Sequence, residues 1–186
     1  MNTMREPFLV SIHLLAALCT LLSMMIVYNA FDTHSGGDFA IYSILFTGGL
    51  WLIVAYLYIG GKRKVHKIAN SIFGSNANVI SHYAPGSGRY IGIDINTGNI
   101  LLIALNKSGQ QTFGFEFNDW AGYEQNDCAL KLKFNNLDNP SFKVNSNAKI
   151  IPFIHKLDFL LSPSYSPSKC NNKKFSQIVS ERMQAA

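Results

Sequence analysis

Charged residues are absent from two long stretches near the N-terminus of this 186-residue chain. Residues 8–28 and residues 39–59 are predominantly apolar, and neither stretch contains Asp, Glu, Lys or Arg. Because an α-helix rises about 1.5 Å per residue, each run of 21 residues is long enough to cross roughly 30 Å of hydrocarbon. The missing charge therefore predicts a two-helix transmembrane hairpin within residues 1–61.

Lysine and arginine are also absent from the short loop between the two runs, residues 29–38. Four of these residues follow the second run almost at once, at Lys62, Arg63, Lys64 and Lys67. Positive side chains are retained on the cytoplasmic side of a membrane. We therefore predict a multi-pass membrane protein with both termini in the cytoplasm.

A cleaved signal peptide is the alternative for the first apolar run, because short N-terminal apolar segments serve both purposes. Two features disfavour cleavage. The single positive charge that precedes the run, Arg5, is cancelled by Glu6, and no small-residue cleavage site closes the run near residues 28–30.

Cysteine is scarce, with three in the whole chain. Cys19 lies inside the first apolar run, and Cys128 and Cys170 are far apart with no CxxC or Cys/His spacing around them. This pattern predicts neither a disulfide framework nor a zinc site.

Enzyme motifs are missing as well: there is no GxSxG, no HExxH and no Walker-type GxxxxGK sequence. His66, His82 and His155 are too scattered to indicate a metal site, and Asp94 and Glu116 fall at positions where a strand would turn them outward into solvent. We therefore expect a protein that is not an enzyme and that needs neither a metal nor another cofactor.

The formal net charge of +5 is unevenly distributed along the chain. Residues 1–61 carry Arg5 against Glu6, Asp32 and Asp38, a net charge of −2, which leaves +7 for residues 62–186. The dense part of this positive charge adjoins the membrane runs and the remainder is scattered singly. Anionic lipid of the inner leaflet is therefore the expected partner of the cluster, and nucleic acid is not.

Each apolar run has one face of small residues: Ala16, Thr20 and Ser23 in the first, and Ala40, Ser43 and Thr47 in the second. Helices in lipid associate by close packing, so these faces predict the seam of the hairpin. Self-association of two chains through the same faces is the alternative. His13 is the only strongly ionisable side chain in either run, and neither run offers it a charged partner.

Residues 62–75 predict a short amphipathic helix. Apolar residues recur at helical spacing from Val65 to Phe73, and Lys64 and Lys67 take the other face. We expect this segment to continue the second span or to lie along the inner leaflet. In either arrangement Lys62, Arg63, Lys64 and Lys67 would contact the membrane surface.

From about residue 76 the apolar period changes from 3.6 to 2, which is typical of β-strands. Asn96-Thr97-Gly98-Asn99 supplies a tight turn between two such segments and predicts a β-hairpin. Further alternating segments centre on Phe115, Leu132 and Phe142. Together they predict six or seven sequential antiparallel strands within residues 76–161.

After the strands the period is helical again, with Pro152 in a first-turn position and apolar residues from Phe153 to Leu161. Residues 162–174 are rich in Ser, Pro, Asn and Lys and predict a linker, followed by a short helix near the C-terminus. The predicted fold is thus a membrane hairpin and an α+β, mainly-β domain. The domain would be an antiparallel meander that curls into a partly open pleckstrin-homology-like barrel with a C-terminal helix.

Residues 89–161 resemble a class of uncharacterised bacterial membrane-tethered domains of pleckstrin-homology-like type, many of them from plasmids and prophages. The residues that carry the resemblance are 90–100 (YIGIDINTGNI), 115–120 (FEFNDW), 130–132 (LKL) and 139–144 (NPSFKV). The resemblance implies a role in a mobile element, such as conjugal exclusion or superinfection exclusion. Fold analogy alone does not define a function.

Trp120 and Tyr123 are the candidate partner contacts, because both follow a polar turn between strands. Core packing is the alternative for these two aromatic side chains. The sequence therefore predicts a non-enzymatic inner-membrane protein that presents a cytoplasmic β-domain to lipid or to another protein. An accessory subunit of a membrane secretion or transport complex is the alternative.

Overall fold

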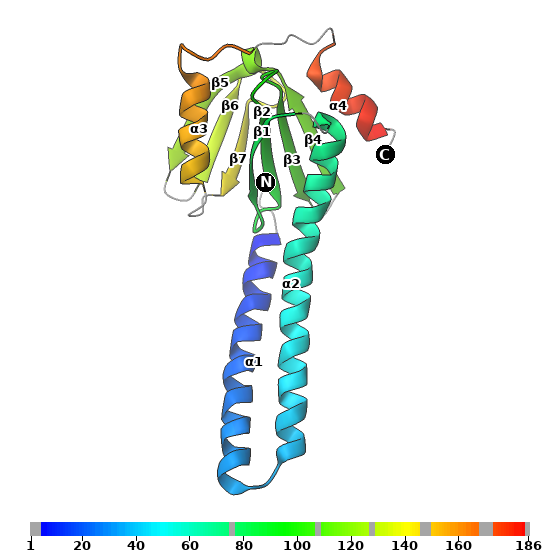
Figure 1. The fold of residues 1–186 in the computed structure, drawn as a ribbon, viewed down its shortest axis with the longest axis vertical. Coiled ribbons are helices and arrows are strands. Elements are labelled where there is room, and N and C mark those ends of the chain that lie inside the picture. Colours follow the sequence, from blue (N-terminus) through cyan, green and yellow to red (C-terminus); the bar gives the residue numbers. More distant parts are fainter. Residues whose placement is uncertain are drawn as a thin grey trace. The chain divides into compact units, whose positions relative to one another are not determined.

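The computed structural model describes residues 5–74, 77–106, 109–126, 129–145, 150–167 and 173–184. The chain forms two compact units, residues 1–61 and residues 62–186. Figure 1 shows a pair of long helices in the first unit, and β-strands with shorter helices in the second.

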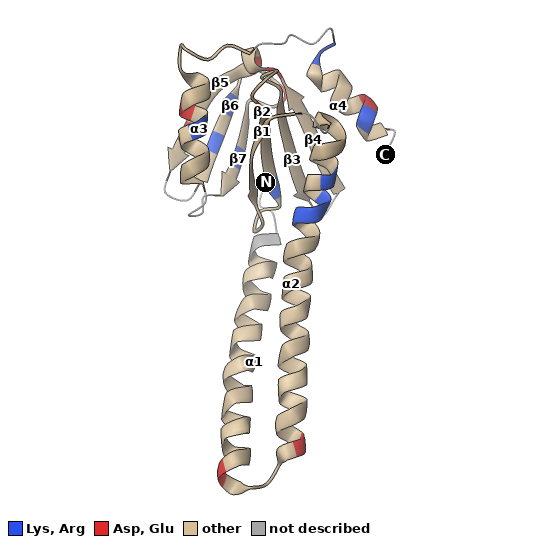
Figure 2. Cartoon of the chain, in the orientation of Figure 1, with Lys and Arg blue, Asp and Glu red and all other residues tan. Residues whose placement is uncertain are grey.

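Two long helices, α1 (Arg5–Thr33) and α2 (Gly37–Phe73), contain the two apolar runs. Both helices are long and apolar enough to cross a membrane. Charged side chains of the described hairpin residues lie at its loop end, where Asp32 and Asp38 flank the turn (Figure 2). The turn contains His34 with φ of 51° and Gly36 with φ of 77°, so glycine accommodates part of the reversal.

The seam between α1 and α2 uses the small-residue faces expected from the sequence. Ala16, Ser23, Ala40 and Thr47 are all buried. The Ser23 and Ser43 hydroxyls lie 3.1 Å apart across the seam, and the Thr47 hydroxyl donates to the Cys19 carbonyl at 3.5 Å. The prediction of an intramolecular seam is confirmed.

The strands of the second unit form two antiparallel sheets. The four-stranded sheet has the order β1 (Val79–Ala84), β2 (Arg89–Asp94), β3 (Ile100–Asn106) and β4 (Gly109–Phe115). The 3-10 turn η1 (Phe117–Asp119) leads into the three-stranded sheet, with the order β5 (Trp120–Asn126), β6 (Ala129–Phe134) and β7 (Ser141–Asn145). Helices α3 (Ile151–Leu161) and α4 (Phe175–Gln184) follow. The prediction of sequential antiparallel strands followed by a helix is confirmed.

The turn between β2 and β3 is closed by Asp94. Its carboxylate accepts hydrogen bonds from the Asn96 backbone N–H at 3.1 Å and from the Thr97 hydroxyl at 2.7 Å, and Gly98 takes a φ of 72°. Asp94 is only 6% exposed. The expectation that this carboxylate faces solvent was therefore wrong, because the side chain folds back on its own turn.

The main core lies between the two sheets and α3. It includes Ile91, Leu102, Leu132 and Leu157, one or more from each of these layers. Along β1 the burial alternates, as a half-buried strand requires, and β3 differs because its residues from Ile100 to Ala104 are all buried. Other elements of the fold must therefore pack on the second face of β3 as well.

A second cluster covers that outer face. It joins Tyr90, Leu101 and Ile103 of the sheet to the last turns of α2 and to α4; the helical members are Val65, Ala69, Ile72, Phe175 and Val179. The amphipathic segment is thus the end of α2, and its apolar side packs on the sheet. This accounts for the fully apolar run in β3.

Two glycines let the helices approach closely. Gly92 and Gly114 are the partners of Leu101 on the two neighbouring strands. A Cβ atom on Gly92 would lie 3.0 Å from the Phe73 ring, and one on Gly114 would lie 2.7 Å from the Val179 Cγ2 atom. The backbone of the sheet therefore forms part of the helix-packing surface.

Polar contacts fix both ends of α4. The Phe175 backbone N–H donates to the Glu116 carboxylate at 3.3 Å, and the Arg182 guanidinium donates to the Ile72 carbonyl at 2.6 Å. Arg182 also donates to the Ser71 carbonyl, so it satisfies two carbonyls at the C-terminal end of α2. Glu116 was expected in solvent, and it is instead partly buried in this contact with α4.

We expect Gly114→Ala to loosen α4, because the new Cβ would overlap Val179 and overpacking costs about 1–3 kcal/mol. Hydrogen exchange of the full-length protein in detergent should show faster exchange in residues 175–184. The matched control is Gly60→Ala, where no atom lies within 4 Å of the new Cβ. Unchanged exchange of α4 in Gly114→Ala would contradict this packing.

Candidate functional site

The basic cluster occupies exposed positions on α2. Lys62, Arg63, Lys64 and Lys67 are all exposed. Figure 2 marks them in blue on this helix. Within the described parts of the chain, the salt bridges join Glu124 to Lys131 and Lys133, and Glu181 to Lys173, so none uses the cluster. Four unneutralised cations beside an apolar span are suited to anionic headgroups, at about 1 kcal/mol for each cation near the surface.

The indole of Trp120 belongs to the core. Trp120 is 7% exposed, and its Nε1–H donates to the Gly122 carbonyl at 2.8 Å. The ring also packs edge to face on Phe117, with 6.0 Å between centroids. Core packing, the alternative in the sequence analysis, therefore describes Trp120, and a surface contact through this side chain does not.

Tyr123 links the second sheet to α3. Its hydroxyl donates a hydrogen bond to the Asp158 carboxylate. Burial, this hydrogen bond and the negative charge of Asp158 raise the pKa of Tyr123 to about 12. The phenol therefore stays protonated at neutral pH and acts as a donor between β5 and α3.

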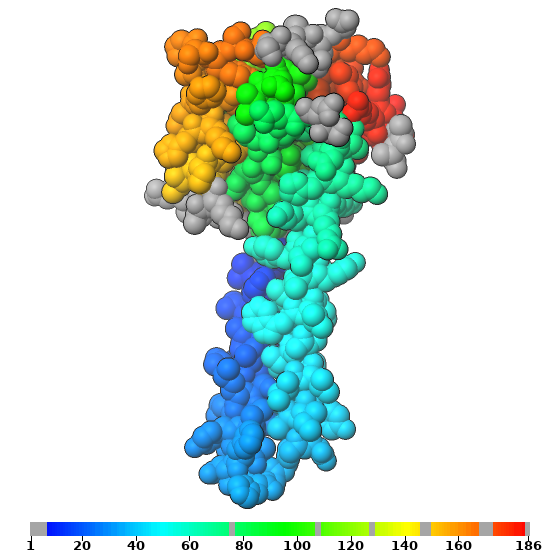
Figure 3. All heavy atoms as spheres, in the orientation of Figure 1, coloured from blue at the N-terminus to red at the C-terminus, as the bar shows by residue number. Residues whose placement is uncertain are grey.

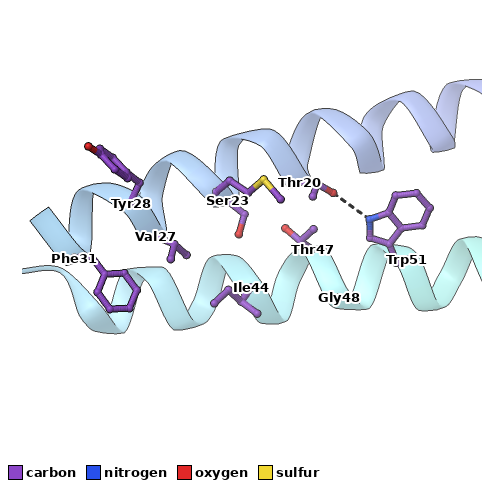
Figure 4. A pocket seen from close by; sticks show the side chains of 10 residues that line it. Thr20, Ser23, Val27, Tyr28, Phe31, Ile44, Thr47, Gly48 and Trp51 are labelled. Carbon is purple, nitrogen blue, oxygen red and sulfur yellow. Dashed lines mark hydrogen bonds between the residues drawn. The ribbon is translucent and has the colours of Figure 1, made fainter.

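A groove of 580 Å³ lies between the two helices of the hairpin (Figure 4). Its walls include Val27, Phe31, Ile44 and Trp51. The Trp51 indole donates to the Thr20 hydroxyl at 3.0 Å, as the dashed line in Figure 4 marks. The lining hydroxyls of Thr20, Ser23 and Thr47 are bonded within the hairpin, so the groove presents a mainly apolar surface that suits hydrocarbon.

His13 lies between the two helices of the hairpin. Its Nδ1 atom is 2.7 Å from the Leu9 carbonyl, and its ring packs edge to face on Trp51 and Tyr58 at centroid distances of 6.3 and 6.1 Å. These contacts give the imidazole a structural place in the hairpin seam. They bring no carboxylate or amine to it.

His82, which the sequence analysis named only among the scattered histidines, is buried in the fold. It is 6% exposed, and its ring lies on Phe153 of α3 with 5.6 Å between centroids. Its Nε2 atom has no hydrogen-bond partner among the described residues. Burial lowers the pKa of His82 below its ordinary value, because the charged form would lose its hydration.

Groups of acidic, histidine and cysteine side chains do not gather in the described parts of the chain. No three of them lie close enough together there to hold a metal ion. His66 packs on Tyr90 and His155 is exposed on α3, so the three scattered histidines stay apart in the fold. Cys128, Lys169 and Cys170 lie outside the described residues.

The chain was compared with protein families, curated proteins and solved structures. No family model, curated protein or solved structure matches this chain. A function for the chain must therefore come from its own residues.

The contacts that sequence reasoning missed are those between distant segments. Glu116 contacts the first residue of α4, which lies 59 residues further along the chain. Arg182 contacts the end of α2, and its partners lie 110 or more residues before it. The apolar spacing of Phe175, Ile178 and Val179 could have indicated that α4 packs on the domain. No local signal identifies Arg182 as a carbonyl ligand.

We expect acidification to weaken the β-domain through His82. Because the pKa of His82 is lowered in the folded state, the unfolded chain binds a proton more readily. The free energy of unfolding therefore has its full value above about pH 6.5. At lower pH it decreases by at most about 1.4 kcal/mol per pH unit. Denaturant unfolding in detergent, in a Trp51→Phe background where Trp120 reports, measures this loss.

In His82→Phe, the stability difference from the parent should change between pH 7.5 and pH 5. Phe153→Leu is the control, because it alters the same packing without a titrating group and should shift stability equally at both pH values. Equal pH dependence in the parent and in His82→Phe would contradict a buried neutral imidazole.

Proposed function

We propose that this chain is a non-enzymatic inner-membrane protein that holds a cytoplasmic β-domain at the membrane surface, where the domain binds another protein. The observation that supports this most directly is the packing of the last turns of α2 into the second cluster. Val65 is the first buried residue of that segment, and it lies only six residues after Ile59, where the apolar run ends. The domain is thereby tethered within a short length of chain from the bilayer.

A pleckstrin-homology-like fold is part of the proposal. It is supported by a four-stranded and a three-stranded antiparallel sheet around one core, with α3 packed against them. Domains of this general build carry their binding surfaces on strand edges, loops and the helix rather than in an enclosed active site. Such a surface suits an adaptor better than an enzyme.

The proposed topology places both termini in the cytoplasm. It is supported by the cluster at Lys62, Arg63, Lys64 and Lys67 and by the loop without lysine or arginine. We expect alkaline phosphatase fused to the C-terminus to be inactive and a green fluorescent protein fusion to be bright. The control is phosphatase inserted after Ser35, which should be active. High phosphatase activity at the C-terminus would contradict the orientation.

We expect in-cell photocrosslinking to find a discrete protein partner of the β-domain. A photoreactive residue is placed at exposed positions on each sheet, at Gln111 on the four-stranded sheet and at Gln125 and Lys143 on the three-stranded sheet, and at Leu52 of the hairpin as the lipid-facing control. One adduct of defined mass from the domain positions, absent from Leu52, supports the proposal. Adducts to lipid alone, or no adduct from any domain position, contradict it.

The family resemblance adds a biological process to this proposal, the exclusion of an incoming plasmid or phage.

The second candidate function is an accessory subunit of a membrane complex. It is favoured by the apolar groove of the hairpin, which could accept a further membrane span. Purification from its native host discriminates the two. A constitutive subunit co-purifies in fixed stoichiometry, whereas an exclusion protein lowers plasmid or phage uptake when expressed alone.

A further inference from the structure

Strand β1 forms one edge of the four-stranded sheet. The Ile95 backbone N–H donates to the Asn78 carbonyl at 2.9 Å, and the register continues from there through Ile80 opposite Ile93. In an antiparallel pair, hydrogen-bonded positions alternate with positions that turn their N–H and C=O groups away. The backbone groups of Val79 and Ser81 therefore point outward, and no described residue pairs with them.

A groove of 610 Å³ runs beside this edge, between β1 and α3. Figure 3 shows the yellow and orange atoms of α3 meeting the green atoms of the first strands on one face of the β-domain. Val79 and Ile95 line the groove from the sheet, and Phe159 and Leu160 line it from α3. Phe159 is 58% exposed and adds an aromatic ring to the apolar wall of the groove.

Charge around the groove has one sign. Lys156 and His155 line it, and no Asp or Glu is among its described lining residues. Lys156 is exposed and takes part in none of the salt bridges of the described residues. A ligand in the groove would therefore meet apolar walls, a row of backbone donors and acceptors, and a cation at the rim.

We infer that the edge of β1 and the adjoining groove bind an extended acidic segment of a partner protein, which adds to the sheet as a further strand. Backbone groups of the segment pair with Val79 and Ser81. On the face of the segment toward α3, apolar side chains enter the groove beside Phe159 and a carboxylate meets Lys156. This inference rests on the proposed function and names its class of partner. Strand addition uses main-chain hydrogen bonds for affinity and alternate side-chain pockets for specificity.

The probe is a library of octapeptides with apolar residues at every second position and random residues between them, and one position of the apolar set is a fixed glutamate. The matched library carries lysine at that position. The protein is the full-length chain, held one copy to a nanodisc. We expect the glutamate library to be retained at least about tenfold better, with competition by salt. Equal retention of both libraries would overturn the inference.

An N-methyl scan of the best peptide tests the strand geometry on the unaltered protein. Methylation removes one N–H donor at a time, and only alternate positions of an added strand donate to β1. We expect losses of at least about tenfold at alternate positions and little change between them. Losses without alternation, or none, would show that the peptide does not pair with the edge.

Variants then locate the site on the chain. Ser81→Pro removes an outward N–H and leaves the β1–β2 hydrogen bonds in place, since proline is tolerated on edge strands. We expect it to abolish peptide binding, whereas Ser81→Ala, the control for the lost hydroxyl, retains it. Lys156→Glu should transfer the preference to the lysine library. Full binding by Ser81→Pro, or an unchanged preference in Lys156→Glu, would overturn the inference.

A second copy of the chain is the competing occupant of this edge. If peptide addition dissociates a dimer in detergent, and Ser81→Pro is a monomer without peptide, the edge serves self-association and the inference is overturned. If the strand-addition inference fails in this way, the proposed function is still tested by the photocrosslinking experiment. Photocrosslinking from Gln125 or Lys143 reports a partner that uses the three-stranded sheet instead of the β1 edge.

Discussion

The strand that carries apolar residues on both faces, β3, imposes the main constraint on this protein. A strand of Ile100, Leu101, Leu102, Ile103 and Ala104 needs cover on both sides, because each exposed apolar side chain costs about 1.5–3 kcal/mol relative to burial. The three-stranded sheet and α3 cover one side. The end of α2 and α4 cover the other, so the domain cannot be complete without the segment that follows the membrane run.

This requirement explains why the helix that carries the basic cluster has a second use. The same turns that expose Lys64 and Lys67 bury Val65 and Ala69 against the sheet. Gly92 and Gly114 remove the side chains that would hold the helices away from Leu101. Arg182 satisfies carbonyls at the end of α2 that have no partner within the helix. One helix therefore supplies both the basic surface beside the apolar run and a structural layer of the domain.

Local patterns were sufficient to predict the elements but not their partners. The uninterrupted run from Ile100 and the spacing of Val65, Ala69 and Ile72 each indicated an apolar surface, yet neither pattern states that the two surfaces meet. Asp94 was misassigned because strand alternation describes the direction of Cβ, whereas a short carboxylate can fold back on the following turn. Trp120 looked like a candidate contact because of the polar turn before it, and its burial depends on strands and a helix far along the chain.

The edge of β1 stands apart from the rest of the sheet, whose faces are covered. Open edges are aggregation hazards that proteins limit by short strands and by neighbouring charge. Strand β1 has only six residues, and Lys156 lines the groove beside this strand. So short an edge offers few backbone hydrogen bonds, which are too weak to select a partner by themselves. Selectivity must then depend on the side chains of α3. An exposed Phe159 beside a lysine favours a segment that carries apolar residues and one acidic residue on the face toward α3.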